Sequence, residues 1–205
     1  TANNENYTFD AVLYATGRRP NTTNIGLENT DITTNERGAI VVNDTCESSV
    51  PGVYAVGDVN GGPQFTYISL DDFRIVFGAL TGNGHYTLKD RKNIPYTTFL
   101  TPPLARVGLT EEDAINKGYT VKTKEMLVAT MPRAHVNDNL KGAFKIVVDA
   151  ESNLILGATL YSQSAEELIN MIKVAMDNNI PYTYFKNQIF THPTMAENLN
   201  DLCNF

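Results

Sequence analysis

Short, continuous apolar runs in the first part of the chain predict strands that are covered on both faces. The run at residues 11–15 predicts a strand over residues 7–15, and residues 53–56 predict a second buried strand. Residues 38–43 predict a further short strand. Strands of this kind are typical of α/β folds, in which helices cover both faces of a parallel sheet.

A helix is expected after these strands, at residues 67–81. Its apolar positions Phe73, Val76, Phe77 and Leu80 are spaced i, i+3, i+4, i+7 and predict one buried stripe. The start of such a helix offers amide donors and the positive end of the helix dipole to an electron-rich ligand. The first part of the chain is therefore expected to be α/β.

The pattern changes at residues 82–93, which are rich in Gly, Asn and Lys and predict a boundary between domains 1–90 and 91–205. The second domain is expected to be α+β, with an antiparallel sheet and helices. Its expected strands are 96–100, 120–129, 144–149 and 154–161, the last two as a hairpin, and its expected helices run from Thr110 to Gly118 and over 164–177.

The helix predicted at 164–177 has a broad apolar stripe. It consists of Leu168, Met171, Ile172, Ala175 and Met176. Such a stripe fits either packing on the domain's own core or a contact with a second subunit, and the pattern alone does not separate these two interpretations.

Residues 191–197 place a histidine and a carboxylate around one bend. Pro193 favours an extended backbone in the residue before it, so His192 is expected to project from the bend, with a helix opening at Pro193 or Thr194. Glu197 could hydrogen-bond one imidazole nitrogen and leave the other for acid–base catalysis. The spacing Thr194-x-x-Glu197 also fits a helix capping box, so a purely structural role stays open.

Two turns follow predicted strands in the first domain. In open α/β sheets, ligands bind beyond the carboxyl ends of the strands. Gly17 comes soon after the first strand and could allow a ligand to approach the backbone closely, or could serve only as a turn. Asp58, after Gly57, could accept hydrogen bonds from the hydroxyl groups of a sugar or polyol, or could cap a turn.

Composition narrows the class of protein. The 205 residues carry a net charge of −7, which argues against a nucleic-acid or membrane-surface partner, and no apolar run is long enough to span a membrane. Cys46 and Cys203 are the only cysteines, so neither a disulfide framework nor a cysteine metal site is expected, and a cytoplasmic setting is the default. The histidines His85, His135 and His192 match no ligand spacing, so no metal site is predicted.

Three motifs carry a family resemblance. They are Ala-Thr-Gly-Arg-Arg-Pro-Asn at 15–21, Ser-Val-Pro-Gly-Val-Tyr-Ala-Val-Gly-Asp at 49–58 and His-Pro-Thr-Met-Ala-Glu at 192–197. In this order the chain resembles the flavin-dependent pyridine nucleotide–disulfide oxidoreductases, which include glutathione reductase and dihydrolipoamide dehydrogenase. The resemblance covers nearly the whole chain but only about the C-terminal half of a family member. It implies that residues 1–90 are the C-terminal portion of a Rossmann-like FAD-binding region with the end of the NAD-binding region, and that 91–205 form a dimerisation domain.

The resemblance also implies site residues. Asp58, with Gly57, would bind the ribityl hydroxyls of the flavin. The backbone amides of Gln64, Phe65 and Thr66 would face its isoalloxazine ring, and Thr16 and Gly17 would line the nucleotide side. His192 and Glu197 would form an acid–base dyad that serves the flavin of the partner subunit in a homodimer.

The implied full-length dimer uses FAD and NAD(P)H to reduce a small-molecule disulfide or oxidant. The family's glycine-rich flavin turn and its redox cysteine pair lie outside these residues. The 205-residue chain alone is therefore expected to show no turnover and little flavin affinity. A non-catalytic dimerisation or interaction module is the alternative.

Departures from the family pattern bear on the substrate. Tyr67 stands where a proline is usual, Asn198 stands where glutathione reductases have a second glutamate, and Cys203 is alone in the C-terminal tail. These differences disfavour glutathione, mercuric ion and thioredoxin. The run at 61–72 resembles a subgroup linked to reactive-chlorine or oxidant defence.

Overall fold

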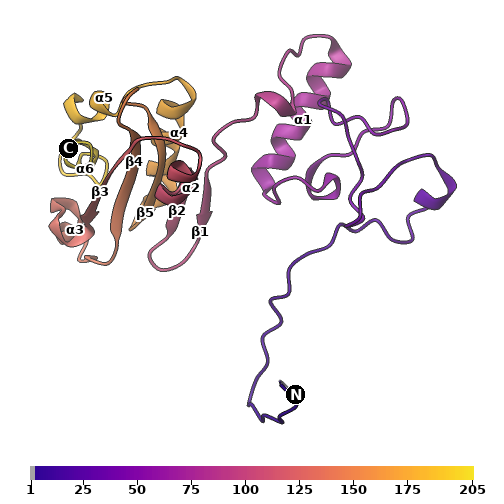
Figure 1. The fold of residues 1–205 in the computed structure, drawn as a ribbon, viewed down its shortest axis with the longest axis horizontal. Helices are drawn as coiled ribbons and strands as arrows, with labels where there is room; N and C mark the ends of the chain where they lie inside the picture. The colour runs from indigo at the N-terminus through magenta and orange to yellow at the C-terminus, as the bar shows by residue number, and fades with distance from the viewer. Residues whose placement is uncertain (1–2) are drawn as a thin grey trace. The chain divides into compact units, whose positions relative to one another are not determined.

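A computed structural model describes residues 3–205, which divide into two compact units with the boundary between Asp90 and Arg91 (Figure 1). The first unit contains one long α-helix and mostly irregular chain. Its helical segments are η1 (Leu27–Asn29), η2 (Gly57–Asn60), α1 (Thr66–Thr81) and η3 (Leu88–Asp90), where η denotes a 3-10 helix.

The three strands predicted for the first unit are wrong. Residues 7–15 form no strand, and Leu13 and Tyr14 are 90% and 85% exposed. The other two segments are reduced to isolated bridges, Thr34 with Ile40 and Glu47 with Tyr54. A buried parallel strand needs neighbouring strands to pair its backbone N–H and C=O groups, and residues 3–205 supply no such neighbours to the first unit.

The helix predicted at 67–81 is confirmed as α1, but its buried face differs from the predicted stripe. The buried residues are Ile68, Asp72 and Ile75, whereas Phe73 and Phe77 are 54% and 56% exposed. Residues of a helix that lie three or four positions apart share a face, so Ile68, Asp72 and Ile75 point in one direction. This face packs toward η2.

The second unit is an antiparallel five-stranded sheet of order β1-β2-β5-β4-β3. The strands are β1 (Tyr96–Thr98), β2 (Leu104–Gly108), β3 (Val121–Leu127), β4 (Ala143–Asp149) and β5 (Ile155–Tyr161). The helical segments are α2 (Glu111–Asn116), η4 (Val128–Thr130), α3 (Pro132–Val136), α4 (Ala165–Asp177), α5 (Tyr182–Asn187) and α6 (Asn198–Leu202). The α+β expectation for this part is confirmed.

Most elements of the second unit follow their predicted positions. The β4–β5 hairpin lies at its predicted place, and Thr110 caps α2 in a capping box with Asp113. The pattern analysis missed β2, which follows directly on Pro102 and Pro103. Inside β2, Ala105 and Val107 are buried. Buried and more exposed residues therefore alternate as expected for a strand, but only over five residues.

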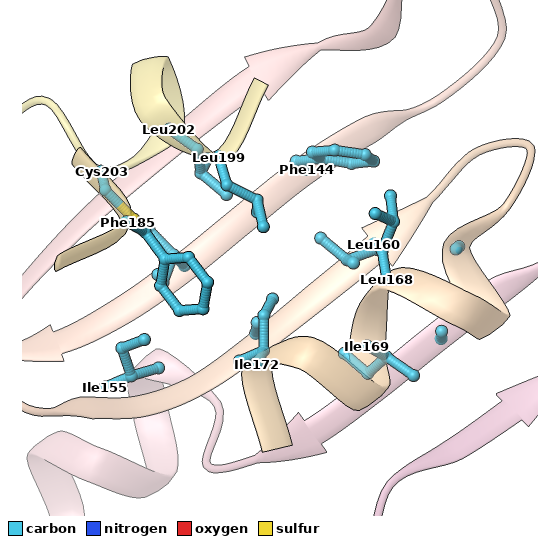
Figure 2. Packing of buried hydrophobic residues seen from close by; sticks show 14 of the residues in the cluster. Phe144, Ile155, Leu160, Leu168, Ile169, Ile172, Phe185, Leu199, Leu202 and Cys203 are labelled. Carbon is cyan, nitrogen blue, oxygen red and sulfur yellow. The ribbon is translucent and has the colours of Figure 1, made fainter. Parts of the chain in front are cut away.

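One hydrophobic core holds the second unit together (Figure 2). Phe144 and Leu160 from the β4–β5 hairpin pack against Leu168, Ile169 and Ile172 from α4. Phe185 from α5 and Leu199, Leu202 and Cys203 at the C-terminal end enter the same cluster. The stripe of α4 therefore packs on its own sheet. No helix within residues 3–205 combines the length and apolarity that crossing a membrane requires.

Candidate active site

A histidine and a glutamate meet at the turn that precedes α6. Nδ1 of His192 lies 2.8 Å from Oε2 of Glu197. The His192 side chain is 68% exposed, whereas that of Glu197 is only 18% exposed. Because Nδ1 is engaged by the carboxylate, Nε2 is the ring nitrogen left for proton exchange with a ligand.

The same carboxylate also serves as a cap. Oε1 of Glu197 accepts a hydrogen bond from the backbone N–H of Thr194 at 3.2 Å, and Oγ1 of Thr194 accepts one from the N–H of Glu197 at 3.2 Å. Both contacts that the spacing allows are therefore present, because each oxygen of Glu197 has its own partner. The expectation that a helix opens at Pro193 or Thr194 is wrong: residues 195–197 form a bend and a turn, and α6 begins at Asn198.

The histidine turn is fixed to the core of the second unit from behind. Met195 is buried, and Leu199 and Leu202 are fully buried in the cluster shown in Figure 2. Asn200 Nδ2 donates to the carbonyl groups of Phe185 and Gln188, at 2.6 and 3.0 Å, which ties the segment before the histidine to α6. The exposed imidazole is therefore carried by a turn whose neighbouring residues are buried and hydrogen-bonded.

Asn198, the departure from glutathione reductases, has a structural role in this turn. It is 2% exposed, and its Nδ2 donates to the carbonyls of Thr194 at 3.2 Å and Met195 at 3.1 Å. An ionised glutamate has no hydrogen to donate and could not make these bonds. Asn198 thus stabilises, through these two hydrogen bonds, the turn that carries His192.

The Gly57–Asp58 turn of the first unit lies at the start of η2. Gly57 has φ +72°, and a Cβ placed on it would lie 2.6 Å from Oγ of Ser69. The positive φ and the close approach of Ser69 on α1 both favour glycine at this position. The Asp58 side chain is 51% exposed, and one of its oxygens lies 4.0 Å from Nη1 of Arg18. This is a carboxylate that a hydroxyl-bearing ligand can reach.

The predicted residues at the start of α1 lie close to this turn in sequence. Phe65 is the N-cap residue with an extended backbone, and its ring stacks on that of Tyr67 at 5.0 Å between centroids. Gln64 is half-buried and Thr66, the first residue of α1, is exposed. The positive end of the dipole of α1 is therefore on the surface of the first unit.

Thr16 and Gly17 lie in the exposed segment that leads to Arg18. Gly17 has φ +96°, and a Cβ added to it would have no atom within 4 Å. The positive φ agrees with a turn, but the space beside it is open. Arg18, which the sequence analysis did not single out, is the residue that connects this segment to Asp58.

Asp72 and Asn60 are further residues around the Gly57–Asp58 turn that were not predicted from the sequence. Asp72 is fully buried, and its Oδ2 accepts hydrogen bonds from the N–H of Gly57 at 2.7 Å and from Nδ2 of Asn60 at 2.9 Å. A signal was present, because Asp72 lies four positions after Ile68 and three before Ile75, on an otherwise apolar helix face. Within residues 3–205, no three His, Cys, Asp or Glu side chains gather where they could hold a metal ion.

Comparison with protein families defines the class to which these features belong. Residues 94–203 match the dimerisation domain of the pyridine nucleotide-disulphide oxidoreductases, and residues 1–72 match the pyridine nucleotide-disulphide oxidoreductase domain. The chain belongs to this family of flavoprotein oxidoreductases, as the three sequence motifs indicated.

Several relatives are similar over nearly the whole chain. A probable pyridine nucleotide-disulfide oxidoreductase, RclA of Escherichia coli, is 48% identical over 94% of this chain and 44% of its own length. A mercuric reductase of Staphylococcus aureus is 36% identical over 93% of this chain and 35% of its own length. A dihydrolipoyl dehydrogenase of Thermus scotoductus is 35% identical over 95% of this chain and 42% of its own length.

Solved structures agree with the sequence relatives. The structure described as the HOCl-induced flavoprotein disulfide reductase RclA from Escherichia coli matches with a TM-score of 0.90 and 47% identity, covering 92% of this chain and 43% of that one. LpdA of Mycobacterium tuberculosis, at 23% identity and a TM-score of 0.81, shows the same fold. The chain spans less than half the length of these relatives.

Proposed function

We propose that this chain is the C-terminal part of an FAD-dependent NAD(P)H oxidoreductase that acts on a disulfide or a related sulfur or oxidant acceptor. In this proposal it supplies half of the flavin site, the His192–Glu197 acid–base dyad and the dimer interface. The observation that carries the proposal is the dyad itself: an exposed imidazole whose Nδ1 lies 2.8 Å from an anchored carboxylate.

The residues of the first unit fit one side of a flavin nucleotide. Asp58 is an exposed carboxylate that can accept hydrogen bonds from ribityl hydroxyls. The start of α1 offers a positive dipole end, which favours an electron-rich ring edge near Gln64, Phe65 and Thr66. When bound, the flavin supplies electron transfer between a nicotinamide and the acceptor.

His192 would manage the protons that accompany this transfer. Glu197 orients the ring through Nδ1, so Nε2 can give a proton to a leaving sulfur and later take one back. As an imidazolium, the ring would also stabilise a neighbouring thiolate. The second unit matches a dimerisation domain, and we propose that His192 serves the flavin of the partner subunit in a homodimer.

The acceptor we favour is a disulfide or oxidant linked to oxidative stress. The similarity to a relative described as HOCl-induced supports this choice over glutathione, for which the family pattern has a glutamate in place of Asn198. The hydrogen bonds that Asn198 donates to the carbonyls of Thr194 and Met195 support this choice, because they give the position a structural role in the turn.

The test is His192→Ala in the full-length dimeric enzyme. Loss of an acid–base group lowers turnover by about 10²–10⁴-fold, so NAD(P)H-dependent disulfide reduction should fall by this factor while the flavin content stays unchanged. His85→Ala, which removes an exposed histidine of the first unit, is the matched control and should keep normal turnover. Near-normal turnover of His192→Ala would remove the catalytic role.

Glu197→Gln separates orientation from capping. The amide keeps an oxygen acceptor for the N–H of Thr194, so the turn should fold and turnover should fall less than in His192→Ala. Unfolding of this variant would mean that the cap is the dominant role of Glu197.

A non-catalytic dimerisation module is the second candidate, favoured by the closed core of residues 91–205. It predicts that the 205-residue chain forms a compact dimer in solution whatever its flavin content. Size-exclusion chromatography with light scattering measures whether the chain is a dimer, and an absorption spectrum in the flavin range measures whether it holds flavin.

A further inference from the structure

A buried carboxylate in the middle of α1 has no part in the function proposed so far. Asp72 is 0% exposed, although it lies on a helix of which much of the surface is open. Burying a carboxylate is costly unless hydrogen bonds compensate for its lost hydration. An aliphatic residue would satisfy the packing between Ile68 and Ile75 without this cost, so the carboxylate indicates a specific role.

The hydrogen bonds of Asp72 show what that role is. Oδ2 accepts from the backbone N–H of Gly57 at 2.7 Å and from Nδ2 of Asn60 at 2.9 Å. Gly57 and Asn60 are the first and last residues of η2, and Asp58 lies between them. A single oxygen of α1 therefore holds both ends of the short segment that carries Asp58.

Asn60 extends this network in two directions. Its Nδ2 also reaches the carbonyl of Ala55 at 3.3 Å, and its Oδ1 accepts from the N–H of Gly62 at 3.0 Å. Gly62 lies in the loop of residues 61–65, which leads through Gln64 and Phe65 into α1. The network thus connects the chain before Asp58 to the loop after it.

The packing around Gly57 completes the attachment. The position of its absent Cβ lies 2.6 Å from Oγ of Ser69, one turn before Asp72 on α1. The turn and the helix are therefore in direct contact at the point where Asp72 accepts the N–H of Gly57. Two separate features, one of packing and one of hydrogen bonding, hold η2 against α1.

We infer that Asp72, acting through Gly57 and Asn60, is a positioning residue that preorganises Asp58 and the 61–65 loop for the hydroxyl groups and ring edge of a flavin nucleotide. This inference rests on the proposed flavin function. Asp72 does not touch the ligand. It fixes the geometry of the groups that do, so its removal weakens ligand binding before it unfolds the protein.

The experiment compares variants of the full-length, flavin-loaded enzyme. Asp72→Ala removes both hydrogen bonds to a charged acceptor, and the Kd for FAD should rise by about 10- to 100-fold. Asp72→Asn keeps an oxygen that can accept both hydrogens and should recover most of the affinity, within about threefold of the unmodified enzyme. Asp71→Asn, which changes the neighbouring carboxylate bonded to Tyr86 at 3.4 Å, is the matched control and should bind FAD normally.

A spectroscopic readout separates positioning from general stability. The visible absorption bands of the bound flavin should shift in Asp72→Ala under conditions in which far-ultraviolet circular dichroism is unchanged. Asn60→Ala should give the same shift, and combining it with Asp72→Ala should add little, because the two residues belong to one network. If Asp72→Ala does not fold, Asn60→Ala provides the same measurement.

The outcomes distinguish this inference from the proposed function. A full-length enzyme that binds no FAD overturns both. An enzyme that binds FAD, with unaltered Kd and flavin spectrum in Asp72→Ala or, where that variant does not fold, in Asn60→Ala, overturns the positioning role alone. A weakened FAD complex that Asp72→Asn does not restore also overturns it, since the acceptor oxygen would then not be what matters.

Discussion

The two units of this chain differ in how far their apolar residues are buried. In the second unit, strands and helices enclose one cluster in which Phe144, Leu160 and Ile172 are fully buried. In the first unit, the apolar residues at 12–14 and the outer face of α1 remain exposed. Both units contain segments whose sequence pattern predicts strands and helices. The difference is that the strands of the second unit pair with one another in one sheet, whereas the strand-like segments of the first unit have no such sheet within residues 3–205.

The comparison suggests how each unit carries its part of the candidate site. The second unit positions His192 on a turn anchored by buried Leu199 and Leu202, so its geometry depends on its own core. The first unit positions Asp58 through a local network centred on Asp72, with little core behind it. Local hydrogen bonds therefore replace burial as the main constraint on the Gly57–Asp58 turn.

Matched phenylalanine variants of the 205-residue chain test this contrast most strongly. Phe144→Ala, in the core of the second unit, should lower the free energy of unfolding by about 3–5 kcal/mol. Phe73→Ala, on the exposed face of α1, should change it by less than about 0.5 kcal/mol. Urea denaturation followed by far-ultraviolet circular dichroism measures both. Equal losses would mean that the exposed face of α1 is covered in solution.

The two cysteines provide a second contrast, because both are buried but lie in different units. Cys46 should react with a disulfide reagent through local opening of the first unit, whereas Cys203 should react only when the core opens. We expect Cys46 to be labelled at least about 100-fold faster at pH 8. The variants Cys46→Ser and Cys203→Ser assign the rates, and similar rates would show that the first unit is as stable as the second.

The pH dependence of stability in the second unit should show a smaller effect. Burial raises the pKa of the Cys203 thiol to about 12, with nearby Lys124 acting in the opposite direction. In the unfolded chain the pKa is about 8.5, so the folded state holds the proton more tightly and stability falls as pH rises above that value. The loss reaches at most about 1.4 kcal/mol per pH unit. Comparing unfolding midpoints of the unmodified chain and Cys203→Ala between about pH 8.5 and 10 measures it, and parallel slopes would contradict the assignment.

The family and most elements of the second unit could be predicted from the sequence alone. The β4–β5 hairpin, the capping box of α2 and the apolar stripe of α4 depend on residues within a few positions of one another, so the local pattern contains the needed information. The three motifs placed the chain in its family, and the spacing from His192 to Glu197 already allowed the 2.8 Å contact that the structure shows.

Which surfaces are covered, and which side chains meet across long stretches of chain, became visible only in the folded structure. The strand predicted at residues 7–15 does not form, because pairing depends on neighbouring strands and not on the strand's own sequence. The contact of Asp72 with Gly57 spans fifteen positions and follows from the packing of α1 on η2, which no local period encodes. Glu197 contacts both the imidazole of His192 and the backbone N–H of Thr194 because its two oxygens point to different groups, and only the folded turn shows this.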